Sequence, residues 1–322
     1  MKRIILITII LGALAMSVPA FADSVILPHR IIDARTQTVI DFEGLLSACS
    51  DADIVALGEQ HDDPGTHLIE LAVLEGLYRH HGNVIVSMEM FERDTQSVLD
   101  QYLAGEITEE DFLANSRPWG NYDTDYRPVI EFAKANMLPV IAANVPRPLA
   151  SRIAMGGGYE NAVYTEDELP WIASTYEAPE DDYWTAFNEV MSDPEMGEMH
   201  VTGDMIRDFY ESQVMKDETM AESVTRAWLA NPESLVYFFA GAFHVEDYLG
   251  TFSRIQRNAP DAETVLILVY PVDDIMAGIP EGASKADFYV LVQAPPAEEE
   301  EEMPIVEEES TETGDGNEGG LL

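Results

Sequence analysis

The apolar residues of the chain follow two patterns, short continuous runs and longer segments with helical spacing. Six runs rich in β-branched and aromatic residues are apolar on both faces, as strands buried on both sides are. These runs lie at 53–57, 84–88, 139–143, 235–239, 264–269 and 288–292. Helical patterns separate them, at 64–81, 94–104, 125–136, 201–230 and 246–258, with shorter pieces at 41–49 and 111–115. This order predicts an α/β fold, a mostly parallel sheet flanked by helices and joined by right-handed crossovers.

One connection departs from the alternation. Between the runs at 139–143 and 235–239 lie roughly ninety residues without a strand pattern, much longer than an ordinary crossover. The segment at about 148–200 therefore predicts a helical insert, which we interpret as a lid over the carboxyl edge of the sheet. Aromatic residues and methionines are frequent in it, among them Trp171, Tyr183 and Met199.

Both ends of the chain differ in composition from the part between them, residues 23–296. Residues 1–22 combine the positive pair Lys2 and Arg3, a short apolar stretch and a small-residue pattern ending at Ala22, which predicts a cleavable signal peptide and a periplasmic or secreted protein. Residues 297–322 are acidic, without Lys or Arg, and are expected to be a disordered tail. One domain, at 23–296, is expected between them. Because the only cysteine is Cys49, neither an internal disulfide nor a lipid anchor is expected.

The charge balance narrows the choice of partners. The formal net charge is -43, and eleven of the 60 acidic residues lie in the tail. The body at 23–296 keeps 49 acids against 15 Lys and Arg. Such a surface disfavours anions, so nucleic acid is excluded as a partner.

A short motif, Gly-x-x-His, occurs twice at the end of an apolar run. It reads Gly58-Glu59-Gln60-His61 in the first copy and Gly241-Ala242-Phe243-His244 in the second. The carboxyl ends of parallel strands form the ligand crevice of an open sheet, where a glycine lets the backbone pass close to a bound group. The two imidazoles are therefore expected to face one crevice.

Two further runs end in polar residues that belong at the same edge. Glu89 lies among large apolar residues after the run at 84–88, where burial raises a carboxyl pKa unless a partner holds the charge. The run at 139–143 is followed by Asn144 and Arg147. Four polar groups at four strand ends favour a functional site over isolated structural roles.

Other polar residues are interpreted as structural. Gln213, Asp217 and Ala221 share one helix face, and side-chain bonds that fix the helix on the sheet are favoured over a place in the crevice. Three histidines on the segment 64–81 are assigned no chemistry, namely His67, His80 and His81.

The sequence resembles the ChaN-like family over approximately residues 30–270. The resemblance rests on separated motifs in the same order: Gly58-Glu59-Gln60-His61-Asp62-Asp63-Pro64; Met88-Glu89-Met90-Phe91 with Gln96, Leu99, Tyr102 and Gly105; Trp119 with Tyr126-Arg127-Pro128; Asn144-Val145-Pro146-Arg147; Gln213 with Lys216-Asp217-Glu218-Thr219-Met220-Ala221; and Gly241-Ala242-Phe243-His244.

The resemblance implies two functions. ChaN-like proteins are regarded as exported haem-binding proteins of bacterial iron acquisition, whereas the wider Tiki superfamily includes metal-dependent proteases with paired Gly-x-x-His motifs. Erythromycin-esterase-type hydrolases are distantly similar. By this likeness His61, Glu89 and His244 belong to the site, with Glu59 and Arg147 beside them. The chain departs from the family in lacking the cysteine that carries a lipid in many members.

Haem binding needs an apolar slot, an axial ligand and cations for two propionates. The candidates for the iron ligand are Tyr126, Tyr183, Met199 and His200. The candidates for the propionates are Arg117, Arg127, Arg147 and Arg152. The alternative interpretation of the insert is a packed helical cap without a ligand.

A hydrolytic function needs fewer assumptions than haem binding. His61 is expected to take a proton from water, Glu89 to orient the imidazole or share a metal, and His244 with Arg147 to stabilise the developing oxyanion. If a metal is bound, His61, His244 and either Glu59 or Glu89 form a set that suits Mn, Fe or Zn. A non-catalytic protein for another small molecule is the third class. No stable membrane anchor is expected, and a homodimer is left open.

Overall fold

A central sheet of eight strands organises the protein, in a computed structural model that describes residues 27–193 and 203–295. The strands are β1 (His29–Asp33), β2 (Thr38–Ile40), β3 (Ile54–Glu59), β4 (Val84–Glu92), β5 (Val140–Asn144), β6 (Leu235–Gly241), β7 (Thr264–Val272) and β8 (Phe288–Gln293). The predicted signal peptide, the acidic tail, Met199 and His200 lie outside the described residues.

The strand order is β2-β1-β8-β7-β3-β6-β4-β5. The six strands predicted from the apolar runs pair in parallel, which confirms the α/β assignment. Two antiparallel strands at one edge, β1 and β2, were not predicted. Both are short and partly exposed, so they lack the continuous apolar run that marks the others.

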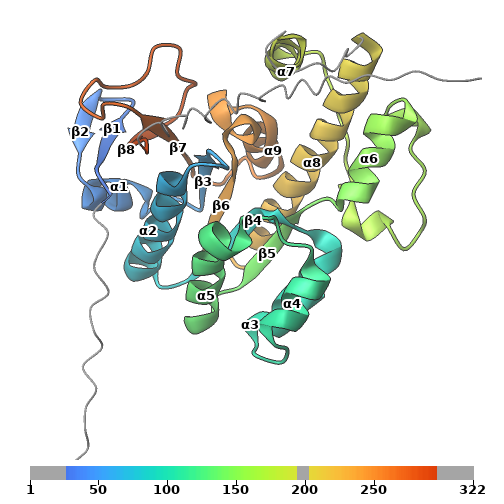
Figure 1. The fold of residues 1–322 in the computed structure, drawn as a ribbon, viewed down its shortest axis with the longest axis horizontal. Coiled ribbons are helices and arrows are strands. Elements are labelled where there is room, and N and C mark those ends of the chain that lie inside the picture. Colours follow the sequence, from blue (N-terminus) through green and yellow to red (C-terminus); the bar gives the residue numbers. More distant parts are fainter. Residues whose placement is uncertain (1–26, 194–202, 296–322) are drawn as a thin grey trace, which may run out of the picture.

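Helices cover both faces of this sheet (Figure 1). They are α1 (Phe42–Cys49), α2 (Pro64–His81), α3 (Gln96–Leu103), α4 (Glu109–Ser116), α5 (Arg127–Ala135), α6 (Arg147–Gly156), α7 (Asp182–Ser192), α8 (Gly203–Ala230) and α9 (Gly250–Asn258). Short 3-10 turns lie at Arg93–Thr95, Tyr159–Asn161, Leu169–Trp171, Ala242–His244 and Glu246–Tyr248, and a π turn at Tyr122–Tyr126. Helices α1 to α5 pack on one face, α8 and α9 on the other.

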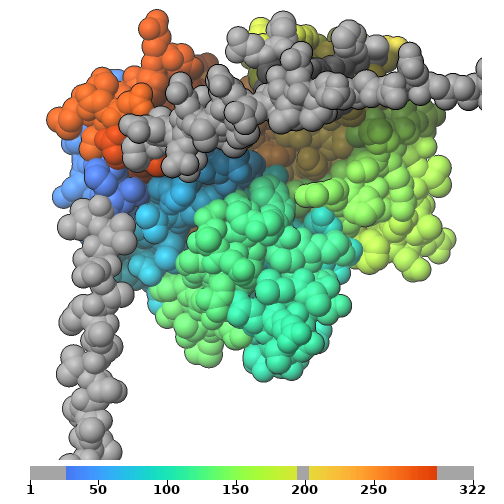
Figure 2. Space-filling model, in the orientation of Figure 1, coloured from blue at the N-terminus to red at the C-terminus, as the bar shows by residue number. Residues whose placement is uncertain are grey.

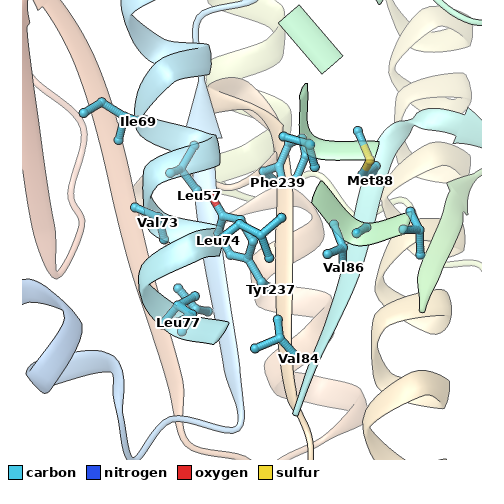
Figure 3. Close-up of a cluster of buried hydrophobic side chains, with 14 of the residues drawn as sticks. Leu57, Ile69, Val73, Leu74, Leu77, Val84, Val86, Met88, Tyr237 and Phe239 are labelled. Carbon is cyan, nitrogen blue, oxygen red and sulfur yellow. The ribbon is translucent and has the colours of Figure 1, made fainter. Parts of the chain in front are cut away.

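Successive side chains of a buried strand point to opposite faces of the sheet, so each strand contributes to the hydrophobic cores on both faces. In β6, Tyr237 and Phe239 face α2, where they meet Val73 and Leu74 (Figure 3). The intervening Phe238 faces α8 and α9. Each strand thus buries both of its faces, which is why its sequence is apolar throughout.

The insert divides into two packing units. Helix α6 lies along α8, with a small core of its own around Met215, on the right of the view in Figure 1. Helix α7 packs against the end of β6, because Tyr183 and Phe187 both contact Phe243. Only α7 therefore covers the carboxyl edge in the way a lid would. Figure 2, in the same orientation as Figure 1, shows α2 to α5 forming one continuous surface.

Candidate functional site

The first Gly-x-x-His motif places a carboxylate and an imidazole together at the end of β3. Glu59, the last strand residue, is only 1% exposed, and its Oε1 contacts His61 Nδ1. The His61 side chain is 40% exposed. Burial opposes the charged imidazolium, but the bond to Glu59 and the charges of Glu59 and Glu89 together outweigh burial and raise the pKa of His61 above its ordinary value. Glu59 therefore orients His61 through Nδ1, and Nε2 lies beside Gly241 of β6.

A π turn before α5 supports this pair from the side. The extra residue per turn brings Asn121 and Tyr126 back toward the motif. Asn121 Nδ2 donates to the carbonyl of His61 at 3.2 Å, and the Tyr126 hydroxyl donates to Glu59 Oε1 at 2.8 Å. Trp119, just before the turn, meets the His61 ring edge-on at 4.9 Å between centroids.

The third group, Glu89, lies where β4 leaves its regular pairing. Strand β4 pairs with β6 only as far as Met88, and its register against β5 shifts between Met88 and Glu92. This irregularity turns Glu89 toward β6, where its Oε2 accepts from the Gly241 backbone amide at 2.9 Å. Its Oε1 lies 3.2 Å from His244 Nε2. Despite burial, His244 lowers the pKa of Glu89 to about 2.

The second motif ends in a histidine held on both ring nitrogens. His244 Nδ1 lies 2.6 Å from Asp217 Oδ1 on α8, while Nε2 faces Glu89. Burial opposes its charge, but Glu89 and Asp217 outweigh burial and raise the pKa of His244 to about 10. His244 is therefore an imidazolium at neutral pH, with no nitrogen lone pair to offer.

The two motif glycines make room for protein groups. A Cβ on Gly241 would lie 2.5 Å from His61 Nε2, so only glycine lets the imidazole rest against β6. A Cβ on Gly58 would lie 2.5 Å from Leu268 Cδ2 on β7. The expectation that these glycines admit a ligand is thus replaced by a role in fixing His61 and the strands.

A hollow of about 440 Å³ opens between the two motifs. We call it the histidine hollow; its lining is Glu59, Gln60, His61, Gln213, Gly241, Ala242, Phe243, His244 and Glu246. It presents one partly exposed imidazole and one buried imidazolium. The convergence predicted for His61 and His244 is found here, with Glu89 behind His244.

A second hollow, of about 630 Å³, lies on the other side of Trp119. We call it the arginine hollow; its lining is Glu92, Arg117, Pro118, Trp119, Gly120, Asn121, Arg147, Pro148 and Ser151. Arg147 lines this hollow and is absent from the lining of the histidine hollow. The expectation that Arg147 helps His244 to stabilise an oxyanion is therefore not supported by this geometry.

The other arginines predicted to bind the haem propionates already bond to carboxylates of the protein. Arg117 bonds Glu92 and Asp94, Arg127 bonds Glu109, and Arg152 bonds Glu168. In an acid-rich chain most arginines find a carboxylate, and only Arg117 of these three borders the arginine hollow. Arg147 forms no ion pair with any described residue.

The tyrosines proposed as iron ligands are placed in the core. Tyr126 is fully buried and gives its hydroxyl to Glu59, and burial with Glu59 raises its pKa. Tyr183 is buried and donates to Asp217. In these positions the two phenols support Glu59 and Asp217, and neither lines the histidine hollow or the arginine hollow.

The predicted strand-end metal set is not assembled. Among the described residues, no three ligand atoms drawn from His61, His244, Glu59 and Glu89 lie within 4.8 Å of one another. Asp217 and Glu89 hold the two ring nitrogens of His244, so that neither nitrogen is directed at His61 and Glu59. Glu59, at the end of β3, instead groups with two residues of α2, His67 and Glu70.

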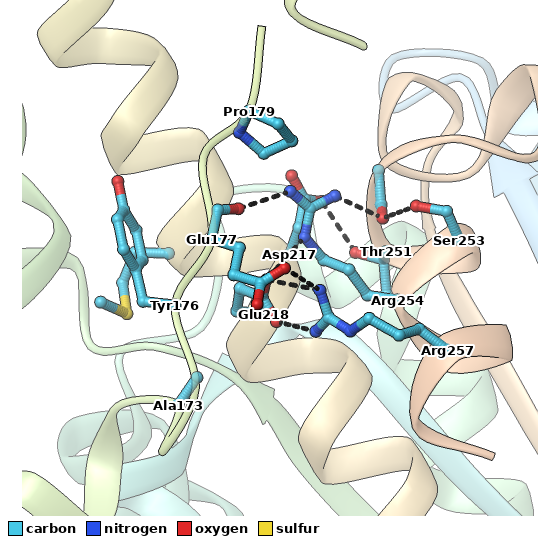
Figure 4. Close-up of polar contacts among 12 residues, drawn as sticks. Ala173, Tyr176, Glu177, Pro179, Asp217, Glu218, Thr251, Ser253, Arg254 and Arg257 are labelled. Atoms are coloured by element: carbon cyan, nitrogen blue, oxygen red, sulfur yellow. Dashed lines mark hydrogen bonds and ion pairs between the residues drawn. The ribbon is translucent and has the colours of Figure 1, made fainter. Parts of the chain in front are cut away.

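Sequence reasoning missed the supporting residues on α8 and α9. Asp217 also accepts from Tyr183 and Thr251, each at 2.8 Å. Figure 4 shows Asp217 and Glu218 on α8 facing α9, where Arg257 pairs with Glu218. The spacing of Gln213 and Asp217 on one helix face indicates that both could reach the crevice. The sequence alone favours a role in fixing the helix on the sheet instead. Both residues in fact reach His244.

Fold and site together define an α/β protein with a paired-histidine crevice at the carboxyl ends of adjacent parallel strands. The sequence matches the family described as haem-binding uptake, Tiki superfamily, ChaN, over residues 45–255. The chain belongs to this family, which confirms the resemblance inferred from its motifs. No curated protein sequence matches it.

Solved structures resemble the chain to different degrees, and the first of those named here shares its fold. The chain ChaN of Campylobacter jejuni, solved with cofacial haem, has a TM-score of 0.61 at 17% identity, covering 83% of this chain and 97% of its own. An erythromycin esterase, EreC, in its open conformation gives 0.45 at 16% identity, covering 83% of each chain. The type III effector HopBA1 gives 0.45 at 10% identity, covering 78% of this chain and 92% of its own. Within residues 27–193 and 203–295, no helix has the length and apolarity of a membrane span.

Proposed function

We propose that this protein binds haem in the arginine hollow and serves bacterial iron acquisition after export. The observation that carries the proposal is the lining of this hollow. Trp119, Pro118 and Pro148 offer flat apolar surfaces suited to a porphyrin, and Arg147 is a cation without a carboxylate partner among the described residues. In a body with a large excess of acids, such an arginine is available for a propionate.

We propose His61 as the iron ligand; it lines the neighbouring histidine hollow, so the haem would have to reach past Trp119. The His61 ring adjoins Trp119, which lines the arginine hollow, and the ring is partly exposed. Glu59 holds its Nδ1, the arrangement that commonly fixes the tautomer of an iron-ligating histidine. Haem would supply the iron centre, and the chain would supply the ligand, the apolar wall and the counter-charge.

Membership of the haem-uptake family supports this assignment, and ChaN of Campylobacter jejuni binds haem cofacially. The pattern of residues 1–22 supports export to the periplasm or beyond. The protein recovered after export is expected to begin at Asp23, and this is the form to use in binding experiments.

Haem titration followed by the Soret band tests the proposal. We expect saturable binding at physiological salt, weakened about tenfold in Arg147→Ala, since a charge-assisted hydrogen bond contributes roughly 1.5–3 kcal/mol. His61→Ala is expected to shift the Soret maximum. Arg127→Ala is the matched control, because Glu109 already holds that guanidinium. No saturable shift in the wild-type protein would refute haem binding.

The histidine hollow favours hydrolysis as a second candidate function. His61, oriented by Glu59, would accept a proton from a water in the hollow, and the His244 imidazolium would provide positive charge on the opposite wall. The Glu89 side chain would act through His244 and Gly241, which it contacts, and not directly on the water.

A panel of p-nitrophenyl esters tests this candidate. We expect any activity to rise with pH through a value above the ordinary 6.5, because the raised pKa of His61 keeps its base form scarce below it. His61→Ala should reduce the rate by about 10²-fold or more. His80→Ala, a helix histidine paired with Glu43, is the control. A rate unaffected by His61→Ala would show that the activity arises elsewhere.

A further inference from the structure

A buried group of two carboxylates and one imidazole lies beneath His61. Glu59, His67 and Glu70 each offer a ligand atom, and these atoms lie within 4.8 Å of one another. Their exposed fractions are 1%, 5% and 0%. His67 is in the first turns of α2, which begins at Pro64 because Asp63 caps the amide of Thr66.

The hydrogen bonds of His67 define its tautomer. Its Nε2 lies 3.0 Å from the backbone carbonyl of His61, which can only accept, so Nε2 carries the hydrogen. In neutral imidazole Nδ1 then keeps its lone pair. Nδ1 points at the carboxylates, 3.0 Å from Glu70 Oε2 and 4.0 Å from Glu59 Oε2. A histidine whose other nitrogen donates to a carbonyl is the usual arrangement of a metal ligand.

Two carboxylate oxygens in this group have no hydrogen-bond partner. Glu59 Oε2 and Glu70 Oε1 are both buried and unsatisfied among the described residues. No described Lys or Arg pairs with either carboxylate. Buried anionic oxygens without partners are costly, and such groups are normally paired or bound to a metal.

We propose that Glu59, His67 and Glu70 bind a divalent transition metal, of the class of Mn²⁺, Fe²⁺ or Zn²⁺. One imidazole with two carboxylates is a donor set that these ions accept. The site is separate from the strand-end histidines and does not depend on haem. Glu59 connects them, because its Oε1 bonds Tyr126 and His61 while Oε2 faces His67. The metal would thus hold the carboxylate that orients His61.

The competing explanation is a proton shared between the two carboxylates. Burial, followed by the charge of Glu59, raises the pKa of Glu70 well above its ordinary value. A shared proton needs no metal and predicts that the protein binds none at this place. The two explanations therefore differ in metal stoichiometry.

The test uses the mature protein, dialysed against a chelator and titrated without haem with Mn²⁺, by calorimetry and by the loss of the free Mn²⁺ electron paramagnetic resonance signal. We expect one equivalent to bind and the unfolding temperature to rise. Glu70→Gln and His67→Gln, both close in shape, are each expected to weaken binding at least tenfold. Glu75→Gln, an exposed site on the same helix, is the control and should bind as wild type does.

Three results would overturn the proposal. The first is an absence of stoichiometric Mn²⁺ or Zn²⁺ binding by wild type. The second is unchanged affinity in both Glu70→Gln and His67→Gln while circular dichroism shows them folded. The third is binding that is lost in His61→Ala and His244→Ala but kept in Glu70→Gln, which would place the metal at the strand-end histidines.

Discussion

Asp217→Ala is expected to lower the free energy of unfolding by about 3–5 kcal/mol, the loss typical of removing one partner from a buried ion pair. Asp217 is fully buried and lies 2.6 Å from Nδ1 of the His244 imidazolium. It also accepts from Tyr183 and Thr251, which link α7 and α9 to α8. Alanine would leave a buried cation with one counter-charge and two hydroxyls without their acceptor.

Urea unfolding at pH 6.5 measures this loss. Asp204→Ala, an exposed aspartate in the first turn of the same helix, is the control and should cost no more than about 1 kcal/mol. Asp217→Asn keeps an oxygen that can accept, so its loss should be smaller than that of alanine. A loss below 1 kcal/mol in Asp217→Ala would mean that His244 is neutral in the folded protein.

The strands that carry the site were predictable because burial on both faces leaves a continuous apolar run. Glu59, His61, Glu89 and His244 follow from that assignment, since adjacent parallel strands end at one edge. Strands β1 and β2 lack this signal, because only Ile31 and Ile32 are buried in β1 and no residue of β2 is buried. Their place at the sheet edge depends on pairing with β8, a contact across most of the chain.

The partners of the site residues were not predictable in the same way. Whether Asp217 supports a helix or binds His244 depends on the rotation of α8 about its axis, which a helical stripe alone does not define. The same holds for Tyr126, whose π turn has no distinctive sequence pattern. Likewise, Arg127 and Arg147 look equivalent in sequence. Only the folded chain shows that Glu109 pairs with Arg127, whereas Arg147 pairs with no acid in residues 27–193 and 203–295.

The stability of the protein is expected to fall as pH rises from about 6.5 to 9, because His244 loses its proton in the unfolded chain and keeps it in the fold. Its pKa in the fold is about 10, against an ordinary 6.5, so folding favours the imidazolium. This contribution is complete below pH 6.5 and is lost as pH rises toward 10. Between these limits it decreases by about 1.4 kcal/mol per pH unit, because the folded state holds one proton more than the unfolded state.

The contribution of Glu89 to the free energy of unfolding changes with pH in the opposite direction and in the acid range. Its pKa of about 2, against an ordinary 4.5, means that its contribution is complete above pH 4.5 and is lost as pH falls toward 2. The pair is therefore at full strength only between about pH 4.5 and 6.5. Urea unfolding of wild type and His244→Gln at pH 6, 7, 8 and 9 isolates the histidine. The difference between the two should shrink as pH rises, since the variant has no imidazole to titrate. Parallel curves would show that His244 does not change its proton occupancy on unfolding, and Asp217 and Glu89 would then surround a neutral ring.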